Sequence, residues 1–462
     1  MSLFVIALLA VCAMLAVGFA LRVGLRPLQA LFIPASVVGG LVGFAAIQAG
    51  LRIDATAEAS QTLAAMLRGW PGLLIAVVFS GLLLERSGKR ISEAAGRAAR
   101  QGVMVWIIVL GQVFLGLLAT WLFVLPFHDV PASFGQLIET GFAGGHGTAA
   151  AMGAIFTDQL DFPEGQDLAY FFATFGLIYG VISGIVMVNI GIRRGWTRSR
   201  HARLTVIQGM ENAREPTPAA YARVRSEVID PLVFQALILA GAFALGWGLQ
   251  TLFTIVAGRV LSAEAMQFVS NIPLFLFTLL GGWCMRELLH AAKLGHLIDP
   301  TSIRRLVATA MEVLIVAGIA SLRIETLQAY LLPTALLLAI GSVWGAVCLL
   351  VFAPRLLPAG YWFELGLINY GMSFATTAQG LMLLRVVDPD LDSGAAEDYA
   401  AAAPLSAPFI GGGVLTVLVF PQTLTWMNPA SVVLVCGLAL LVLLALGWLM
   451  SQREAPAVAA AE

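Results

Sequence analysis

Long apolar segments follow one another along this chain, and each is about as long as a helix that crosses a membrane. Of the 462 residues, 59% are hydrophobic and only 11% are charged, whereas a soluble domain carries about 25% charged residues. Only helices and closed barrels satisfy their backbone hydrogen bonds inside hydrocarbon, and a spanning helix needs about 20 apolar residues. The sequence therefore predicts an all-α polytopic membrane protein. A net charge of −1 gives no sign of a nucleic-acid partner.

The apolar segments predict eleven membrane spans, of which the third and the eighth are short and have uncertain ends. The spans are predicted at 3–21, 28–49, 71–84, 102–126, 168–190, 231–257, 270–291, 309–322, 331–353, 403–424 and 429–450. The first lacks a basic region before it, so we interpret it as a retained helix and not as a signal peptide. The cysteines lie inside apolar segments and are interpreted as packing residues: Cys12, Cys284, Cys348 and Cys436.

The positions of the basic residues predict the orientation of these spans, because lysine and arginine concentrate in cytoplasmic loops. With the N-terminus outside, most of the 26 lysine and arginine residues fall on the cytoplasmic side, many of them in the central segment 191–230. The outer side then keeps four: Arg52, Arg68, Arg259 and Arg323. The N-terminus is thus predicted outside, and the central loop and C-terminus are predicted in the cytoplasm.

A polar, glycine-rich run interrupts the apolar pattern twice, at Glu139–Gly153 and at Glu364–Gly380, and each run opens with Glu-x-Gly. Irregular backbone at membrane depth is tolerated where protein buries it or where it lines a wet cavity. Paired interruptions in the two halves of a chain point to the binding site of a transporter. The predicted orientation puts the first run on the outer side and the second on the inner side. We therefore expect re-entrant hairpins at 137–157 and 362–385 that enter from opposite faces.

Weaker matches between the two halves indicate an internal repeat. The segment "LLIAVVFSGLLLE" ends at Glu85 and "VLIVAGIASLRIE" ends at Glu325, while "FIPASVVGG" has a partner in "NIPLFLFTLLGG". Five spans per repeat is an odd number, so the repeats are expected to have inverted topology, with substrate held between them. The expected organisation is a first repeat, a basic cytoplasmic linker, a second repeat, an extra C-terminal span and a tail, at 1–190, 191–230, 231–427, 428–450 and 451–462.

The tip of the first hairpin offers backbone groups for binding. Its glycines permit close backbone approach, and the N-terminus of a restarting half-helix suits a carboxylate. The alternative is that these small residues only allow helices to pack closely. The candidate binding residues are Gly144, Gly145, His146, Gly147 and Thr148. The histidine either contacts substrate or orients the loop, and no metal-ligand spacing accompanies it, so no transition-metal site is expected.

The tip of the second hairpin offers side chains, which predict a cradle for an amino-acid-sized ligand or a sodium ion. Its uncharged polar residues are Asn369, Ser373, Thr376, Thr377 and Gln379. Hydroxyl and carbonyl oxygens suit sodium, and the candidate sodium ligands are Thr148, Ser373, Thr376 and Thr377. The alternative is that these groups form hydrogen bonds between helices.

Charged residues near the hairpins have more limited predicted roles. Arg385 is either a flanking residue that extends toward the membrane surface or a partner for a substrate carboxylate. Glu139 and Glu364 are expected to anchor the hairpins by accepting hydrogen bonds from backbone N–H groups.

The runs "FIPASVVGG" and "GGHGTAAAMG", the basic central loop and "ELGLINYGMSFATTAQG" with the following "DPDL" resemble the bacterial sodium:glutamate symporter family. The resemblance implies two inverted five-helix repeats, each with a re-entrant hairpin, in a homodimer in the lipid bilayer of a bacterial inner membrane. It also implies sodium-coupled glutamate uptake by elevator-type alternating access, with sodium as coupling ion and no cofactor. The chain departs from the pattern in its single Gly371, its acidic stretch 388–398 and its extra C-terminal span. Another small carboxylate or amino acid is therefore an alternative substrate.

Two other classes of function fit the sequence less well. An ion channel with paired pore loops is one, although channels form rings of several equivalent loops and this chain has two dissimilar tips. An intramembrane enzyme is the other, but no serine or cysteine is placed to pair with His146. The chain is not expected to be an enzyme.

Overall fold

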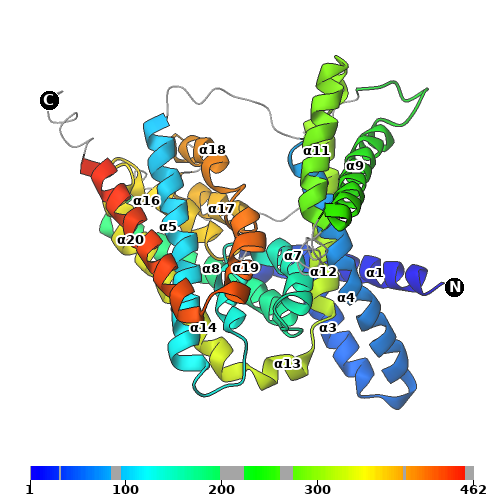
Figure 1. The fold of residues 1–462 in the computed structure, drawn as a ribbon, viewed down its shortest axis with the longest axis horizontal. Coiled ribbons are helices and arrows are strands. Elements are labelled where there is room, and N and C mark those ends of the chain that lie inside the picture. Colours follow the sequence, from blue (N-terminus) through cyan, green and yellow to red (C-terminus); the bar gives the residue numbers. More distant parts are fainter. Residues whose placement is uncertain are drawn as a thin grey trace. The chain divides into compact units, whose positions relative to one another are not determined.

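The computed structural model describes residues 2–30, 33–84, 95–197, 223–260, 274–388 and 392–452, and within them the chain forms only helices, turns and loops (Figure 1). The predicted all-helical fold is confirmed for these residues. Several predictions lie outside them: those for Glu85, for most of the linker, for most of the C-terminal tail and for part of the acidic stretch.

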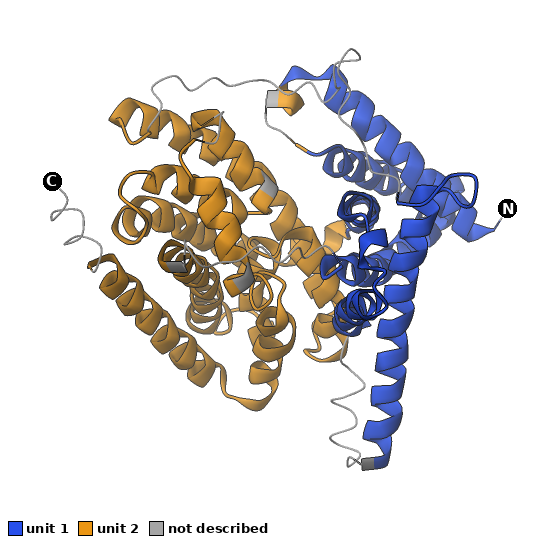
Figure 2. Cartoon of the chain, turned by 90° about the horizontal axis from the view of Figure 1, so that it is seen from above, with its two compact units in different colours: residues 1–26, 34–89, 208–322 blue, residues 27–33, 90–207, 323–462 orange. Residues whose placement is uncertain are grey.

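The chain divides into two compact units, and each takes helices from both halves of the sequence (Figure 2). Unit 1 comprises residues 1–26, 34–89 and 208–322, and unit 2 comprises residues 27–33, 90–207 and 323–462. The short α2 (Arg26–Ala30) begins at the last residue of the first segment of unit 1.

Unit 1 is a bundle in which α1 packs on α3, α12 packs on α3 and α4, and α9 packs on α11. Its helices are α1 (Leu3–Gly24), α3 (Ala35–Leu51), α4 (Asp54–Leu82), α9 (Pro231–Val260), α11 (Leu274–Ala291) and α12 (Pro300–Ala320), with the short 3-10 helix η3 (Gly295–Leu297) before α12.

Small residues and capping groups explain how the helices of unit 1 form and pack. A Cβ atom on Gly39 would lie 2.4 Å from the carbonyl oxygen of Met14, so α1 and α3 approach at backbone distance. The Asp299 carboxylate caps α12 by accepting the N–H of Ser302 at 3.0 Å, and Pro300 occupies the first helical position, where no N–H is needed. The resulting bundle buries a small aliphatic core.

Unit 2 contains two helical hairpins, and each is preceded by a long helix that ends in a π-helical turn. Before the first hairpin stand α5 (Ala95–Ala119) and η1 (Thr120–Val124); before the second stand α13 (Ile324–Ala329), α14 (Leu331–Val347), η4 (Cys348–Phe352) and α15 (Ala353–Leu356). The first hairpin consists of η2 (Ala132–Gln136), α6 (Leu137–Gly141) and α7 (Gly145–Asp158), and the second of α16 (Trp362–Met372) and α17 (Thr377–Val387).

A further helix follows each hairpin. The first hairpin leads into α8 (Gly165–Arg194), a continuous helix. The second leads into α18 (Ala395–Ser406), η5 (Leu415–Val419) and α19 (Phe420–Trp426). The last helix, α20 (Pro429–Gln452), packs along α5, and the two lie side by side in Figure 1.

The helices α5 and α14 of unit 2 pack against one another and run in opposite directions. The indole Nε1–H of Trp344 donates to the carbonyl oxygen of Ile108 at 2.9 Å. Nearer the start of α5, Nε of Arg100 donates to the carbonyl oxygen of Leu356 at 2.8 Å. The beginning of α5 therefore lies beside the end of the α14–η4–α15 segment.

Seven helices in the described part of the chain are long and apolar enough to cross a membrane. They correspond to the predicted spans 3–21, 71–84, 102–126, 168–190, 231–257, 331–353 and 429–450. The short predicted spans 71–84 and 309–322 are the C-terminal parts of longer helices, α4 and α12. The start of α4 was not predicted because its residues are polar and do not resemble a membrane span. The helix nevertheless continues through Pro71.

Two predicted spans were wrong as continuous helices. The segment 28–49 is interrupted, and α3 begins only after Pro34. The segment 403–424 is divided into α18, a loop over 407–414, and then η5 with α19. Pro408 and three consecutive glycines occupy that loop, and Gly411 and Gly412 have φ values of +64° and +94°, which no helix contains.

Candidate functional site

The tips of the two hairpins touch in unit 2. Gly145, the first residue of α7, has a φ of +63°, and a Cβ atom placed on it would lie 2.7 Å from the carbonyl oxygen of Ala375. Ala375 lies in the turn just before α17. Only glycine accepts both this backbone conformation and this close approach. The half-helices α7 and α17 therefore begin near one another, although they lie far apart in the sequence.

The loop over 407–414, between α18 and η5, forms a third part of this region. The Oε1 atom of Glu139 accepts a hydrogen bond from the N–H of Gly411 at 3.1 Å and another from the Thr416 hydroxyl at 2.7 Å. A Cβ atom on Gly412 would lie 2.3 Å from Oγ1 of Thr148, so this loop also contacts the start of α7. Glu139 does accept a backbone N–H bond as predicted, and the donor comes from outside its own hairpin.

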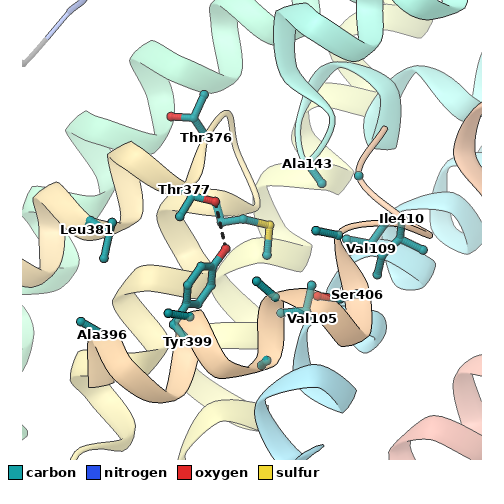
Figure 3. Close-up of a pocket in the computed structure, with 16 residues that line it drawn as sticks. Val105, Val109, Ala143, Thr376, Thr377, Leu381, Ala396, Tyr399, Ser406 and Ile410 are labelled. Atoms are coloured by element: carbon teal, nitrogen blue, oxygen red, sulfur yellow. Dashed lines mark hydrogen bonds between the residues drawn. The ribbon is translucent and has the colours of Figure 1, made fainter. Parts of the chain in front are cut away.

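A cavity of about 480 Å³ opens between these elements (Figure 3). Its walls come from α5, from the first tip at Ala143, from the second hairpin and from α18 with the loop that follows it. Most of the lining is aliphatic. The hydroxyl groups that line it belong to Thr376, Thr377, Tyr399 and Ser406. None of the described residues that line the cavity carries a charge.

Thr376 and Thr377 are the residues of the predicted site that line the cavity. Both are exposed, in contrast to the buried residues that precede them in the hairpin. The Thr376 hydroxyl caps α17 by accepting the N–H of Gln379 at 3.3 Å. The Thr377 hydroxyl lies 3.1 Å from the Tyr399 hydroxyl, and the two side chains point toward one another in Figure 3.

The other polar residues of the second tip lie behind the cavity wall. Asn369 and Gln101 exchange two amide hydrogen bonds, of 2.6 and 2.9 Å, and Asn369 is only 1% exposed. The Ser373 hydroxyl donates to the carbonyl oxygen of Tyr370 at 2.8 Å. Nε2 of Gln379 donates to the carbonyl oxygen of Leu177 at 3.3 Å. Asn369 and Gln379 thus make the hydrogen bonds between helices that were the alternative interpretation.

The candidate residues of the first tip are not among those that line the cavity, although Ala143, which directly precedes them, is. The Thr148 hydroxyl donates to the carbonyl oxygen of Gly144 at 2.8 Å, and Gly147 is half-buried in the first turn of α7. His146 is buried, and its Nε2 lies 3.1 Å from the Thr174 hydroxyl. That hydroxyl already donates to the carbonyl oxygen of Tyr170, so the hydrogen-bond pattern assigns the imidazole proton to Nε2. His146 therefore connects α7 to α8 through this hydrogen bond.

Arg385 is exposed in the last turn of α17 and is not among the residues that line the cavity. A cation in the last turn complements the negative end of the helix dipole. Its position favours the flanking role over contact with a substrate carboxylate.

Sequence reasoning missed Tyr399, Ser406 and Gly411. Ser406 and Gly411 fall in an apolar segment that was interpreted as the start of a plain span, and Tyr399 lies among alanines just before that span. The run "PFIGGG" at 408–413 was the available signal, because a proline and three glycines rarely belong in a helix interior.

A comparison with protein families found that the model described as sodium/glutamate symporter matches residues 3–361. The chain belongs to the sodium/glutamate symporter family. The family match includes the first hairpin and α14 and ends just before α16. A comparison with curated proteins found no match. The resemblance that the sequence suggested is thus confirmed, and the chain is a multi-pass membrane protein of a transport family.

Proposed function

We propose that the protein is a sodium-coupled secondary transporter that imports glutamate, and that the substrate binds in the cavity beside the two hairpin tips. The observation that supports this most is the close approach of Gly145 to Ala375, which brings the beginnings of α7 and α17 together. The cavity of about 480 Å³ falls in the range of about 300–1,000 Å³ that is usual for small-molecule sites.

Helix termini supply the positive charge that a dicarboxylate substrate requires. The first turn of a helix has backbone N–H groups without intrahelical acceptors, and it carries the positive end of the helix dipole. Two such ends, at Gly145 and Thr377, lie near a cavity whose described lining is uncharged. In our proposal these N–H groups and the hydroxyls of Thr377 and Tyr399 hold the carboxylates, and bound sodium neutralises the remaining charge.

The proposed sodium ligands are the hydroxyl oxygens of the two tips. Thr148 and Ser373 each donate their proton to a backbone carbonyl oxygen, which leaves their lone pairs as acceptors for a cation. Thr376 and Thr377 provide two further oxygens at the cavity. Sodium bound there couples the sodium gradient to substrate transport, because sodium and substrate bind at the same hairpin tips.

The internal arrangement of unit 2 supports inverted repeats. A long helix with a π-helical turn, a hairpin and a following helix occur twice, as α5 to α8 and as α14 to α19. We propose the repeats at 1–190 and 231–427, joined by a cytoplasmic linker and followed by an extra span, with both hairpins re-entrant. We also propose that the protein is a homodimer in a bacterial inner membrane, with its N-terminus outside and elevator-type motion of one unit.

The test is uptake of labelled L-glutamate by proteoliposomes that contain the purified protein. We expect saturable uptake under an inward sodium gradient and no uptake when choline replaces sodium. Competition by other small carboxylates and amino acids distinguishes glutamate from the alternative substrates. Uptake that does not depend on the sodium gradient contradicts sodium coupling. An ionic current that does not saturate supports the alternative of an ion channel.

A further inference from the structure

Two ion pairs in unit 2 occupy equivalent positions in the two proposed repeats. Asp167, in the first turn of α8, is 4% exposed and lies with its Oδ2 2.5 Å from Nε of Arg323. Arg323 also donates to the carbonyl oxygen of Pro163 at 3.0 Å. The second acid, Asp398, lies in the first turn of α18 and is 2% exposed.

Asp398 is held from two sides. Nε of Arg97 donates to both of its carboxylate oxygens, at 3.1 and 3.2 Å. The Tyr361 hydroxyl donates to the same carboxylate. Arg97 lies at the start of α5, and Tyr361 directly precedes α16. One buried carboxylate therefore ties together the beginnings of α5, α16 and α18.

Each ion pair joins one repeat to the other, and the two pairs lie at opposite ends of unit 2. Each acid belongs to the helix that follows a hairpin, and each arginine belongs to the start of the long helical segment that precedes the other hairpin. Arg323 stands at the beginning of the α13–α14 segment, whereas the start of α5, which carries Arg97, lies beside Leu356 at the end of that segment.

Each of these following helices also contacts the tip of its own hairpin. On α18, Tyr399 is the residue next to Asp398, and its hydroxyl lies 3.1 Å from that of Thr377, the first residue of α17. On α8, Thr174 bonds to His146, the second residue of α7. Each ion pair thus involves a helix that contacts a hairpin tip.

We propose that Asp398, clamped by Arg97 and Tyr361, is a positioning residue that fixes Tyr399 against Thr377 and thereby sets the affinity for substrate. This inference rests on the proposed function, because the affinity concerned is that of the cavity. A buried carboxylate fixes its helix strongly because an unpaired buried charge is very unfavourable. A shift of α18 by one residue, about 1.5 Å, takes the Tyr399 hydroxyl out of hydrogen-bond reach.

The test measures glutamate uptake by D398N, Y399F and the double variant, each normalised to folded protein in the membrane. We expect each single variant to raise KM about five- to tenfold, the scale of one lost hydrogen bond. The double variant is expected to be no worse than Y399F alone, since Asp398 acts through Tyr399. R97K is expected to retain much of the affinity that R97Q loses. The matched control is R305Q, because Arg305 is exposed in α12 of unit 1.

Two results overturn the proposal. In one, the effects of D398N and Y399F multiply independently. In the other, D398N lowers the amount of folded protein or the maximal rate and leaves KM unchanged, as a merely structural role requires.

A second measurement needs no transport and separates this proposal from the proposed function. Thr377→Cys is introduced after replacement of Cys12, Cys284, Cys348 and Cys436, and its rate of labelling by a maleimide is measured. We expect D398N to raise this rate, because the Tyr399 hydroxyl, which lies 3.1 Å from that of Thr377, no longer packs against position 377. A raised rate supports the clamp even where the protein that keeps Thr377 takes up no glutamate, a result that contradicts only the proposed substrate, while an unchanged rate contradicts the clamp.

Discussion

The carboxylate of Glu139 accepts a hydrogen bond from the N–H of Gly411, a residue 272 positions later in the chain, at a distance of 3.1 Å. This bond ties the first hairpin to the glycine-rich loop that divides α18 from η5. The same oxygen accepts the hydroxyl proton of Thr416. One buried acid thus connects the first tip to the loop that forms one wall of the cavity.

Glu139→Gln is expected to reduce the maximal uptake rate and the thermal stability, because a neutral amide is a weaker acceptor for two donors than a carboxylate. The loss in stability is expected to be about 1–3 kcal/mol, the cost of weakening hydrogen bonds to a buried charged group. Thermal unfolding in detergent and uptake measure the two effects. The control is Glu312→Gln, since Glu312 is exposed in α12. Wild-type stability and rate in Glu139→Gln contradict the anchoring role.

Gly145→Ala is expected to abolish most uptake. A left-handed conformation costs a non-glycine residue about 1–2 kcal/mol, and the new Cβ also lies 2.7 Å from the carbonyl oxygen of Ala375. Gly69→Ala is the matched control, because Gly69 lies in α4 and a Cβ there meets no atom within 4 Å. That variant is expected to transport normally. Equal uptake by the two variants shows that the tips do not depend on this contact.

Thr377→Val is expected to raise the KM for glutamate by about five- to tenfold, the effect of one hydrogen bond. Thr377→Ser keeps the hydroxyl and is expected to stay within about twofold of wild type. The pair separates the hydroxyl from the methyl group, since valine keeps the shape and serine keeps the polarity. Similar KM values in both variants argue against a role for this hydroxyl.

Asn369→Ala is expected to affect stability more than affinity. The change leaves the buried amide of Gln101 without its partner, at a cost of about 1–3 kcal/mol. A lower thermal unfolding temperature with an unchanged KM is the predicted outcome. An increase in KM with unchanged stability supports direct contact between Asn369 and substrate instead.

Arg385→Gln is expected to change the KM for glutamate by less than about twofold, because Arg385 is exposed at the far end of α17 and an exposed charge is strongly screened. Kinetics at several substrate concentrations provide the measurement. A large rise in KM restores the interpretation of Arg385 as a carboxylate partner.

The sequence predicted the positions of the two helical hairpins, and the family, because both depend on local patterns. The glycines around Gly145 indicated a break in the helical backbone, and the long apolar runs indicated the helices. Asn369 illustrates what a local pattern misses. Its partner Gln101 lies 268 positions away, and nothing near either residue shows that the two amides will satisfy one another.

The break after Ser406 was missed for a different reason. Hydrophobicity remains high through the segment 403–424, so the interruption at Pro408 and the glycines that follow was interpreted as part of a span. Tyr399 lies just before that segment, among alanines that gave no periodic signal, and it was given no role. Its role depends on the packing of α18 against the second hairpin, which follows from contacts distant in sequence.

The most direct measurement is a cryo-electron microscopy map of the protein with saturating sodium and glutamate. We expect ligand density in the cavity, within hydrogen-bond distance of the first turn of α7 and of the hydroxyls of Thr377 and Tyr399. Density that contacts only one hairpin, or that lies outside this cavity, contradicts it.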